Sequence, residues 1–361
     1  MKILHITNNL WSGGVTTFLI DLLNYLSLDN EITLLLLGKD DEPYLKEKFN
    51  ENIKIIFLNQ KRLYSITNLL KIRKYIKENE IIHTHLFPSL YLGAISSLCL
   101  NKKLITTEHA AYNNRRKYFF FKWIDKWIYS KYTLVIPCSY GAEKTLIEWL
   151  GEEFRKKIVV ILNGIDLKKY DSLKEKRKEL FKLKEKDKLI CMVARFSKQK
   201  DQKTLLRAME ILSDDIKCIF VGIGEELENI KKYSEDLGLD NKRVRFLGYR
   251  NDVAEILKSC DLSILSSHYE GLPMIALESL AIGTLMIGSR IEGLKEILNE
   301  DELLFEKGNE IELARKINEL LYNEKKIKKL KVKISNEIEK YSIFEMLKSY
   351  KKIYVFKSDK R

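Results

Sequence analysis

Two carboxylates, Glu270 and Glu278, are eight residues apart in a segment whose pattern suits a phosphorylated sugar. The apolar run that ends at Ser266 predicts a strand, Gly271 a turn, and Pro273 the first residue of a helix. Glu270 would then lie in the loop, and Glu278 about a turn and a half inside the helix. The unpaired N–H groups of a helix N-terminus suit a phosphate, and each carboxylate would accept hydrogen bonds from hydroxyls on one side of it. A nucleotide sugar has this layout, although an ordinary strand–turn–helix with a solvated acid pair shows the same spacing.

Two cations follow a second predicted strand: Arg195 comes directly after the run 189–194, and Lys200 five residues later. A diphosphate leaving group accumulates negative charge as its glycosidic bond breaks. Cations held beside it stabilise the transition state more than the ground state, which is the condition for catalysis. On position alone, an ordinary surface role is the commoner explanation for such residues.

Glycines follow two other predicted strands. Gly13 and Gly14 stand before a helix, where they would let the backbone approach a phosphate or a sugar closely. Gly222 and Gly224 suggest a dinucleotide-binding loop, but Leu227 occupies the position of its third glycine. The broken fingerprint argues against a nicotinamide-dependent oxidoreductase.

Of the five histidines, His109 is the best placed for chemistry. It follows the predicted strand 104–106, at the carboxyl end where ligands collect in parallel sheets. His83 and His85 are expected to have structural roles, and His5 is expected in the core.

Short apolar runs alternate with amphipathic segments along the chain, which predicts βα units and parallel sheets. A segment dominated by Lys and Glu, 168–188, separates two sets of runs and is expected to be a solvated linker with a helix. We therefore place the domain boundary near Asp166. The expected strands are 3–6, 32–37, 53–58, 81–82, 104–106, 134–137 and 158–162 in the first half, and 189–194, 216–221, 244–247, 262–265 and 285–287 in the second.

Length and composition indicate a two-domain, globular, cytoplasmic protein. A chain of 361 residues can bury two cores of ordinary size, and 45% of its residues are hydrophobic and 32% charged. The first ten residues are typical of a short strand and lack the pattern of a signal peptide. The longest uncharged run, 81–101, predicts a strand, a turn and a buried helix rather than a membrane span. The five cysteines lack metal-like spacing and suit a reducing compartment.

The net charge of +13 is concentrated in part in residues 112–132. This segment has six basic residues against one acid, Asp125, and nine aromatic residues that include Trp123 and Trp127. Basic and aromatic residues together suit an anionic membrane surface. No nucleic-acid motif accompanies them, so we expect no nucleic-acid partner. A partly buried helix with a solvated face remains an alternative.

Several of these motifs together resemble the retaining glycosyltransferases of family 4 (group 1), and they occur in the same order along nearly the whole chain. The resemblance implies an α/β fold with two Rossmann-like, doubly wound parallel-sheet lobes facing across a cleft, the B-type glycosyltransferase fold. Residues 1–166 would form the acceptor-side lobe, with a C-terminal helix, 341–361, packing back on it, and residues 167–340 the donor-binding lobe. The matching motifs are the glycine-rich loop at 13–14, Asn163–Asp166, Arg195-x4-Lys200, Gly222-x-Gly224 and Glu270-x7-Glu278.

The resemblance also implies residue roles. Glu270 would hold sugar hydroxyls and Glu278 ribose hydroxyls of a nucleotide-diphosphate sugar, while Arg195 and Lys200 neutralise the diphosphate. His109 would be directed at the donor sugar. The remaining implied substrate-binding residues are Gly13, Gly14, Gly222, Tyr249, Arg250, Gly271, Leu272, Met274 and Ile275.

By the same resemblance, the expected reaction is transfer of a sugar to a glycan or lipid-linked acceptor in the assembly of a surface polysaccharide, capsule or lipopolysaccharide. No metal or cofactor is expected, and the leaving phosphate itself would take the proton of the acceptor. A protein with this role would work in the cytoplasm or on the inner face of the cytoplasmic membrane.

The sequence departs from the family pattern in two segments, and two other functions are compatible with the motifs. The segment 284–289 lacks a proline that relatives often carry, and 291–294 has one glycine where two are common. A nucleotide-sugar epimerase of the same fold would bind the same donor without an acceptor. A non-catalytic sugar-nucleotide-binding scaffold is the second rival, although the presence of both carboxylates and both cations argues against it.

Overall fold

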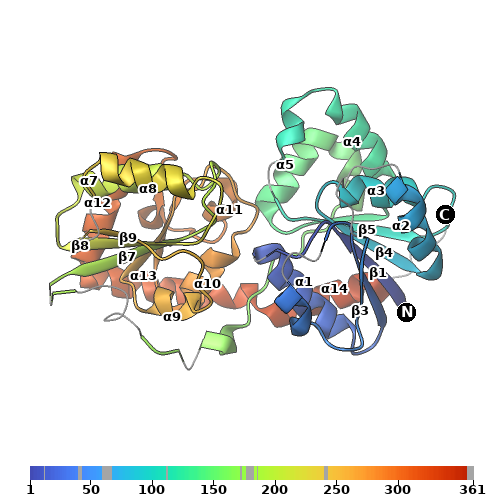
Figure 1. Ribbon diagram of the computed structural model, residues 1–361, viewed down its shortest axis with the longest axis horizontal. Coiled ribbons are helices and arrows are strands. Elements are labelled where there is room, and N and C mark those ends of the chain that lie inside the picture. Colours follow the sequence, from blue (N-terminus) through green and yellow to red (C-terminus); the bar gives the residue numbers. More distant parts are fainter. Residues whose placement is uncertain are drawn as a thin grey trace. The chain divides into compact units, whose positions relative to one another are not determined.

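The computed structural model of the chain describes residues 1–11, 13–39, 43–58, 67–110, 113–170, 173–175, 183–184, 186–239 and 243–355. They divide into two compact units, residues 1–164 with the stretch that begins at Phe344, and residues 165–343 (Figure 1). Part of the predicted linker 168–188 and the last residues of the predicted terminal helix lie outside the described residues.

The first unit is a six-stranded parallel sheet flanked by helices on both faces (Figure 1). Its strands lie in the order β3-β2-β1-β4-β5-β6, so the strand order reverses between β1 and β4. The strands are apolar and mostly buried because helices cover the sheet on both sides. They are β1 (Lys2–Thr7), β2 (Glu31–Leu36), β3 (Lys54–Phe57), β4 (Ile81–His85), β5 (Lys103–Glu108) and β6 (Leu134–Pro137). The helices are α1 (Gly14–Leu26), α2 (Thr67–Glu78), α3 (Ser89–Ser96), α4 (Phe121–Ser130), α5 (Tyr140–Leu150) and α14 (Ile343–Val355).

The second unit repeats this architecture with the strand order β12-β11-β10-β7-β8-β9, which reverses between β10 and β7. In Figure 1, α7 and α8 cover one face of its sheet, and α9, α10 and α13 cover the other. The strands are β7 (Lys188–Val193), β8 (Ile216–Val221), β9 (Val244–Phe246), β10 (Leu262–Leu265), β11 (Met286–Ser289) and β12 (Leu304–Phe305). The helices are α7 (Gln202–Ile211), α8 (Leu227–Asp236), α9 (Val253–Lys258), α10 (Met274–Ile282), α11 (Glu292–Lys295), α12 (Glu310–Leu321) and α13 (Glu324–Glu337).

The structure bears out the predicted strands with two exceptions. The run 158–162 is no strand, because the chain makes only one bridge to β6, between Ile158 and Val135, before it leaves the sheet. The strand β12 was not predicted, because its two residues are too few to show a pattern. The uncharged run 81–101 forms β4 and α3, as predicted. Among the described residues, no helix combines the length and apolar composition that crossing a membrane requires.

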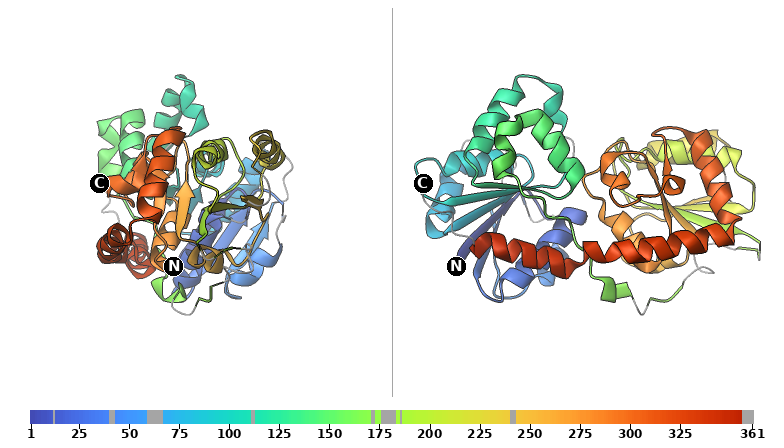
Figure 2. Two further views of the ribbon diagram at one scale, coloured as in Figure 1. Left: turned by 90° about the vertical axis from the view of Figure 1, so that its left-hand side faces the viewer. Right: turned by 180° about the vertical axis from the view of Figure 1, so that it is seen from behind.

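Helix α14 returns from the end of the chain to the sheet of the first unit (Figure 2). The hydroxyl of Tyr350 is 3.2 Å from Oγ1 of Thr107, and the hydroxyl of Tyr354 contacts His83. The Lys103 ammonium donates to the carbonyl of Ile353 at 2.6 Å. These contacts fix the last helix over residues of β4 and β5.

Candidate functional site

The loops after β7 and β10 hold the strongest candidates for chemistry in the second unit. These two strands are neighbours at the centre of the sheet, where the strand order reverses. In open α/β sheets, ligands bind at this reversal, beyond the carboxyl ends of the strands. Lys200 follows β7 and Glu270 follows β10, so topology brings together two residues that are 70 positions apart.

Lys200 and Glu270 form an ion pair through Nζ and Oε1. Ser267 donates a second hydrogen bond to the same Oε1 at 2.6 Å. The exposed fractions are 18% for the lysine side chain and 9% for the carboxylate, so breaking the pair would leave a charge in a largely dry place. Both interactions fall on Oε1, and Oε2 has no hydrogen bond or ion pair with the described residues. A ligand hydroxyl could therefore donate to that oxygen.

Further hydrogen bonds join the same two loops. The amide of His268 donates to the carbonyl of Gln199 at 2.7 Å, and the side chain of Gln199 donates to the carbonyl of Tyr269 at 2.7 Å. The hydroxyl of Ser266 donates to the carbonyl of Asp201 at 2.8 Å. Ser267 and Gln199 were not predicted as site residues, and their only signal in the sequence is that each adjoins a predicted site motif. Their bonds keep the ion pair in one geometry without a ligand.

The loop that carries Glu270 leads into α10, whose N-terminus is uncapped. Pro273 is the N-cap residue and Met274 the first helical residue, one position later than predicted. No side chain caps this end, and the amides of Met274 and Ile275 have no hydrogen-bond partner among the described residues. Because the dipole of the helix adds positive potential at this end, it suits an anion such as a diphosphate.

Glu278 lies four residues beyond Met274 and thus on the same side of α10. Its carboxylate is partly buried, and no hydrogen bond reaches it from the described part of the chain. Burial raises the pKa of Glu278, and the positive charge of Lys169 offsets only part of that rise. Ribose hydroxyls would supply the hydrogen bonds that this carboxylate lacks.

Gly222 and Gly224 position the backbone around Arg195. A Cβ on Gly222, whose φ is +135°, would lie 2.1 Å from the carbonyl oxygen of Ala194, and one on Gly224 would lie 2.2 Å from that of Phe196. Only glycine permits this contact between the loops after β8 and β7. Arg195 itself is 62% exposed and pairs with Glu225 at 3.1 Å, so a phosphate would have to compete for its guanidinium.

Gly293 in α11 supports the loop that carries Glu270. A Cβ at this position would lie 2.3 Å from the carbonyl oxygen of Gly271 and 2.8 Å from that of Glu270. The one glycine that the chain has in 291–294 is therefore the one that this close packing requires.

The other predicted residues of the second unit differ in their surroundings. Arg250 makes two hydrogen bonds with Asp252, of 2.7 and 2.6 Å, which occupy its guanidinium. Tyr249 beside it is 53% exposed, whereas Leu272 is 4% exposed and belongs to the core. Of these three, Tyr249 is the side chain best placed to stack on a base.

In the first unit, the predicted residues gather at the N-terminus of α1. Gly13 is the N-cap of this helix and Gly14 its first residue, and no side chain caps it. One turn further, the ring of Phe18 lies edge-on to the partly buried ring of His109, with 5.0 Å between the centroids. Nε2 of His109 is 3.2 Å from Nδ1 of His85. The helix N-terminus and His109 are therefore close together.

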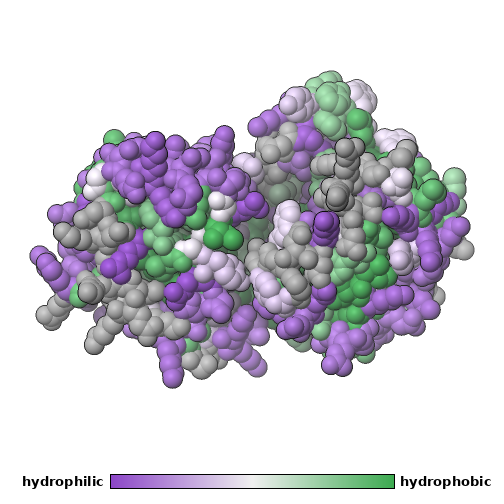
Figure 3. Space-filling model, viewed as in Figure 1, coloured by the Kyte–Doolittle hydropathy of each residue, from purple (hydrophilic) through white to green (hydrophobic). Residues whose placement is uncertain are grey.

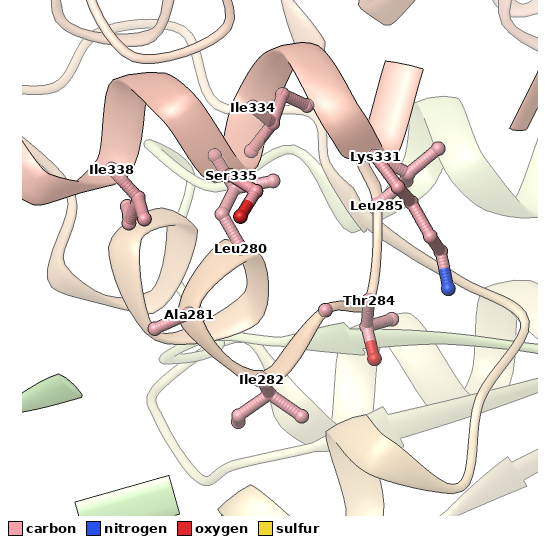
Figure 4. A pocket seen from close by; sticks show the side chains of 10 residues that line it. Leu280, Ala281, Ile282, Thr284, Leu285, Lys331, Ile334, Ser335 and Ile338 are labelled. Atoms are coloured by element: carbon pink, nitrogen blue, oxygen red, sulfur yellow. The ribbon is translucent and has the colours of Figure 1, made fainter. Parts of the chain in front are cut away.

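A cavity of about 250 Å³ lies elsewhere, at the C-terminal end of α10 beside α13 (Figure 4). Lys331 is the one charged residue among those that line it, and none of the predicted site residues does so. The hollow thus has neither the carboxylates nor the helix N-terminus that a sugar diphosphate needs. It is lined by Leu280, Ala281, Ile282, Gly283, Thr284, Leu285, Lys331, Ile334, Ser335 and Ile338.

Residues 113–132, the described part of the basic and aromatic segment, contain a buried polar cluster and an exposed aromatic surface. Arg115 and Asp125 form a buried ion pair at 3.0 Å, with exposed side-chain fractions of 4% and 0%. Tyr91 and Trp149 also donate to Asp125, so this pair serves the fold and Arg115 does not face a membrane. In Figure 3, hydrophobic side chains (green) and side chains of intermediate hydropathy (pale) lie among hydrophilic ones (purple) at the end of the first unit where Figure 1 shows α4. The large exposed side chains of this surface are Tyr118, Phe119, Phe120, Trp123, Ile124 and Trp127.

Two family models match the chain and between them cover most of its length. Residues 12–169 match the model described as Glycosyltransferase Family 4, and residues 174–340 match the one described as Glycosyl transferases group 1.

Among the relatives is a UDP-Gal:alpha-D-GlcNAc-diphosphoundecaprenol alpha-1,3-galactosyltransferase of Escherichia coli, 32% identical over 260 residues. These are 67% of this chain and 64% of that enzyme, so the chain spans just under two thirds of the length of this relative. An N-acetylgalactosamine-N,N'-diacetylbacillosaminyl-diphospho-undecaprenol 4-alpha-N-acetylgalactosaminyltransferase of Campylobacter jejuni is 27% identical over 88% of this chain and 89% of its own.

The fold agrees with these matches. The structure of HepE from Anabaena in complex with UDP-glucose superposes with a TM-score of 0.87 over 98% of this chain and 99% of that one, at 21% identity. Both the family and the fold class that the sequence predicts are thereby confirmed. The chain belongs to glycosyltransferase family 4, the group 1 glycosyltransferases, and has their two-lobed α/β fold.

Proposed function

We propose that the protein transfers a sugar from a UDP sugar to a lipid-linked glycan, with retention of configuration at the anomeric carbon. The partly buried Lys200–Glu270 pair and the uncapped N-terminus of α10 that follows its loop carry this proposal. They place a cation, two free amides and a carboxylate where the sheet topology favours a ligand. The neighbour crystallised with UDP-glucose supports a UDP donor, and the relatives named for diphosphoundecaprenol-linked acceptors support the acceptor class.

In the proposed reaction, the second unit binds the diphosphate. The Lys200 ammonium and the amides of Met274 and Ile275 stabilise the charge that develops on the leaving phosphate. Oε2 of Glu270 accepts hydrogen bonds from sugar hydroxyls, and Glu278 accepts them from the ribose. The bond from the anomeric carbon to the phosphate oxygen breaks as the acceptor oxygen bonds to the same face. The phosphate oxygen takes the proton of the acceptor, so the protein supplies no base.

We infer further that no metal ion takes part, because the lysine and the helix N-terminus supply the positive charge that a divalent cation would otherwise bring to the diphosphate. EDTA should accordingly leave the rate unchanged.

The donor proposal is tested by thermal unfolding of the full chain with UDP, GDP, ADP and their common sugar conjugates. A ligand at a hundred times its Kd adds about 2.7 kcal/mol of stability, which is visible as a shift in Tm. We expect the shift with UDP compounds, and sugar transfer only when a diphosphoundecaprenol-linked acceptor is added. Conversion of the UDP sugar without an acceptor would favour the epimerase, and a shift with UDP compounds without any sugar transfer would favour the scaffold. The absence of any shift would overturn the donor proposal.

The acceptor proposal implies a peripheral membrane surface on α4. Replacing both Trp123 and Trp127 by serine is expected to weaken binding to vesicles with 30 mol% phosphatidylglycerol by roughly tenfold or more, since each exposed indole contributes about 1–2 kcal/mol on leaving water. Vesicle co-sedimentation measures it. The matched control is Tyr44→Ser, which removes an exposed aromatic ring from another segment of the first unit. Equal binding by the wild type and the double variant would remove the membrane from the proposal.

A further inference from the structure

Four of the five histidines of the chain lie side by side on one face of the first unit's sheet. His5 is on β1, His83 and His85 are on the neighbouring β4, and His109 directly follows β5. Nε2 of His85 is 3.0 Å from Nδ1 of His5, and Nδ1 of His85 is 3.2 Å from Nε2 of His109. Three of the rings therefore form a hydrogen-bonded chain, with His85 in the middle.

His83 supports this chain from the side. The centroids of the His83 and His85 rings are 4.2 Å apart. Nε2 of His83 is 2.8 Å from Oγ1 of Thr107. Its Nδ1 contacts the hydroxyl of Tyr354 on α14. Both nitrogens of His83 are thus bound to hydroxyl groups, and neither belongs to the line from His5 to His109.

All four imidazoles are neutral at neutral pH. Burial lowers the pKa of His5 and of His109 to about 3, and it holds the pKa of His83 and of His85 well below the usual value, with the neighbouring histidines adding to the effect. A neutral imidazole has one N–H donor and one nitrogen acceptor. Each contact in the chain therefore pairs one donor with one acceptor, and all the donors point the same way along it.

The surroundings of His5, at one end of the hydrogen-bonded row, determine in which direction the donors point. Nε2 of His5 is buried and has no hydrogen-bond partner among the described residues. An orphaned N–H there would cost more than an unused lone pair, so the proton of His5 is on Nδ1. His5 then donates to His85, His85 donates from Nδ1 to His109, and His109 holds its own proton on Nδ1.

We propose that His5 and His85 are positioning residues that fix His109 as its Nδ1–H tautomer, so that this nitrogen donates a hydrogen bond to a substrate hydroxyl. Nδ1 of His109 has no partner within the described part of the chain, and its ring is only partly buried. The role given to the substrate rests on the proposed function, whereas the tautomer is a property of the free protein.

A metal ion is the rival explanation. His5, His83 and His85 each have a ligand atom within 4.8 Å of the others. Zinc would require three such nitrogens at about 2.0–2.1 Å from one point. In the structure, both nitrogens of His83 are instead bound to hydroxyl groups, those of Tyr354 and Thr107, so His83 has no nitrogen left for a metal ion.

Nitrogen-15 NMR of the full chain distinguishes the tautomers, because the protonated and unprotonated ring nitrogens differ in chemical shift. We expect the Nδ1–H form of His5, His85 and His109 in the wild type. His5→Leu removes the donor at the far end and should give a mixture of tautomers at His109 and a loss of about tenfold in kcat/KM. His5→Asn places an amide donor at the position of Nδ1 and should restore both. Tyr354→Phe deletes a buried hydroxyl that does not belong to the hydrogen-bonded row from His5 to His109, and it should change neither the tautomer nor kcat/KM.

Each other result would contradict a specific part of this proposal. An Nε2–H form of His109 in the wild type, or an unchanged tautomer in His5→Leu, would overturn the proposed relay, the control of the His109 tautomer by His5 through His85. So would equal losses in His5→Leu and Tyr354→Phe, because they would indicate a general packing effect. One equivalent of Zn²⁺ that shifts the signals of His5, His83 and His85, reversibly with EDTA, would replace the relay by a metal site. If the tautomers are as expected but His109→Ala keeps full activity, the proposed role of His109 is wrong and the relay stands.

Discussion

Replacing Lys200 by glutamine is expected to lower kcat by about 10²–10³-fold, the range found when one donor to a developing negative charge is removed. The ammonium is held beside the N-terminus of α10 by its pair with Glu270 and cannot be replaced by solvent without rearrangement. KM for the donor should change less than kcat, because the charge on the leaving phosphate is largest in the transition state. The substitution also leaves the Glu270 carboxylate without its cation, which should cost about 1–3 kcal/mol of stability.

Steady-state kinetics with the UDP sugar, together with thermal unfolding, separate these two effects. Lys198→Gln is the matched control, since it removes an exposed lysine from the same loop two residues earlier and should leave kcat within about twofold, as surface substitutions usually do. Lys200→Arg retains the charge and should be the least impaired variant at position 200. A folded Lys200→Gln protein with kcat close to wild type would exclude Lys200 from the catalytic step.

Glu278→Gln is expected to weaken binding of UDP by about 10–100-fold and, at neutral pH, to raise the Tm of the ligand-free protein. The loss of affinity follows because a hydrogen bond to a charged acceptor contributes about 1.5–3 kcal/mol. The gain in stability follows from burial. Because the pKa of Glu278 is raised in the folded state, its protonated form stabilises the fold at low pH, and this contribution is lost as the pH rises through the folded-state pKa. A neutral glutamine carries no such penalty.

The pH dependence provides the check. The difference in Tm between Glu278→Gln and the wild type should shrink as the pH falls toward about 4, where a glutamate protonates. Isothermal titration calorimetry with UDP measures the affinity. Glu235→Gln, which neutralises an exposed carboxylate on α8, should leave UDP binding unchanged. If Glu278→Gln bound UDP as well as the wild type, the ribose role would have to be given up.

The sequence was sufficient for eleven of the twelve described strands, because each of these is a short apolar run bounded by polar residues. It was not sufficient for the two-residue β12, and it predicted a strand at 158–162 that does not form. It was also sufficient to rank Glu270 and Lys200 as candidates. It could not show that they touch, because the neighbouring positions of β7 and β10 follow from the order of the whole sheet and not from any local pattern. The role of Gly293 was hidden for the same reason, since it depends on the approach of α11 to the carbonyls of the Glu270 loop.

Arg115 shows a different limit. In the sequence it stands among five other basic residues and nine aromatic ones, which predicts a solvated or membrane-facing side chain. In the structure it is paired with Asp125, the one acid of that segment, and both are buried. Composition gives the average environment of a segment, whereas the position of one charge depends on a partner ten residues away.

The return of α14 also has a consequence for the order in which the chain can fold during its synthesis. A ribosome completes residues 165–343 before it adds the helix that covers β4 and β5. The second unit therefore has all of its residues first, although N-terminal domains generally fold first. Until Tyr350 and Tyr354 emerge, Thr107 and His83 lack these partners and the nascent first unit exposes part of its sheet. A nascent chain stalled before α14 should accordingly be the form that most needs a chaperone.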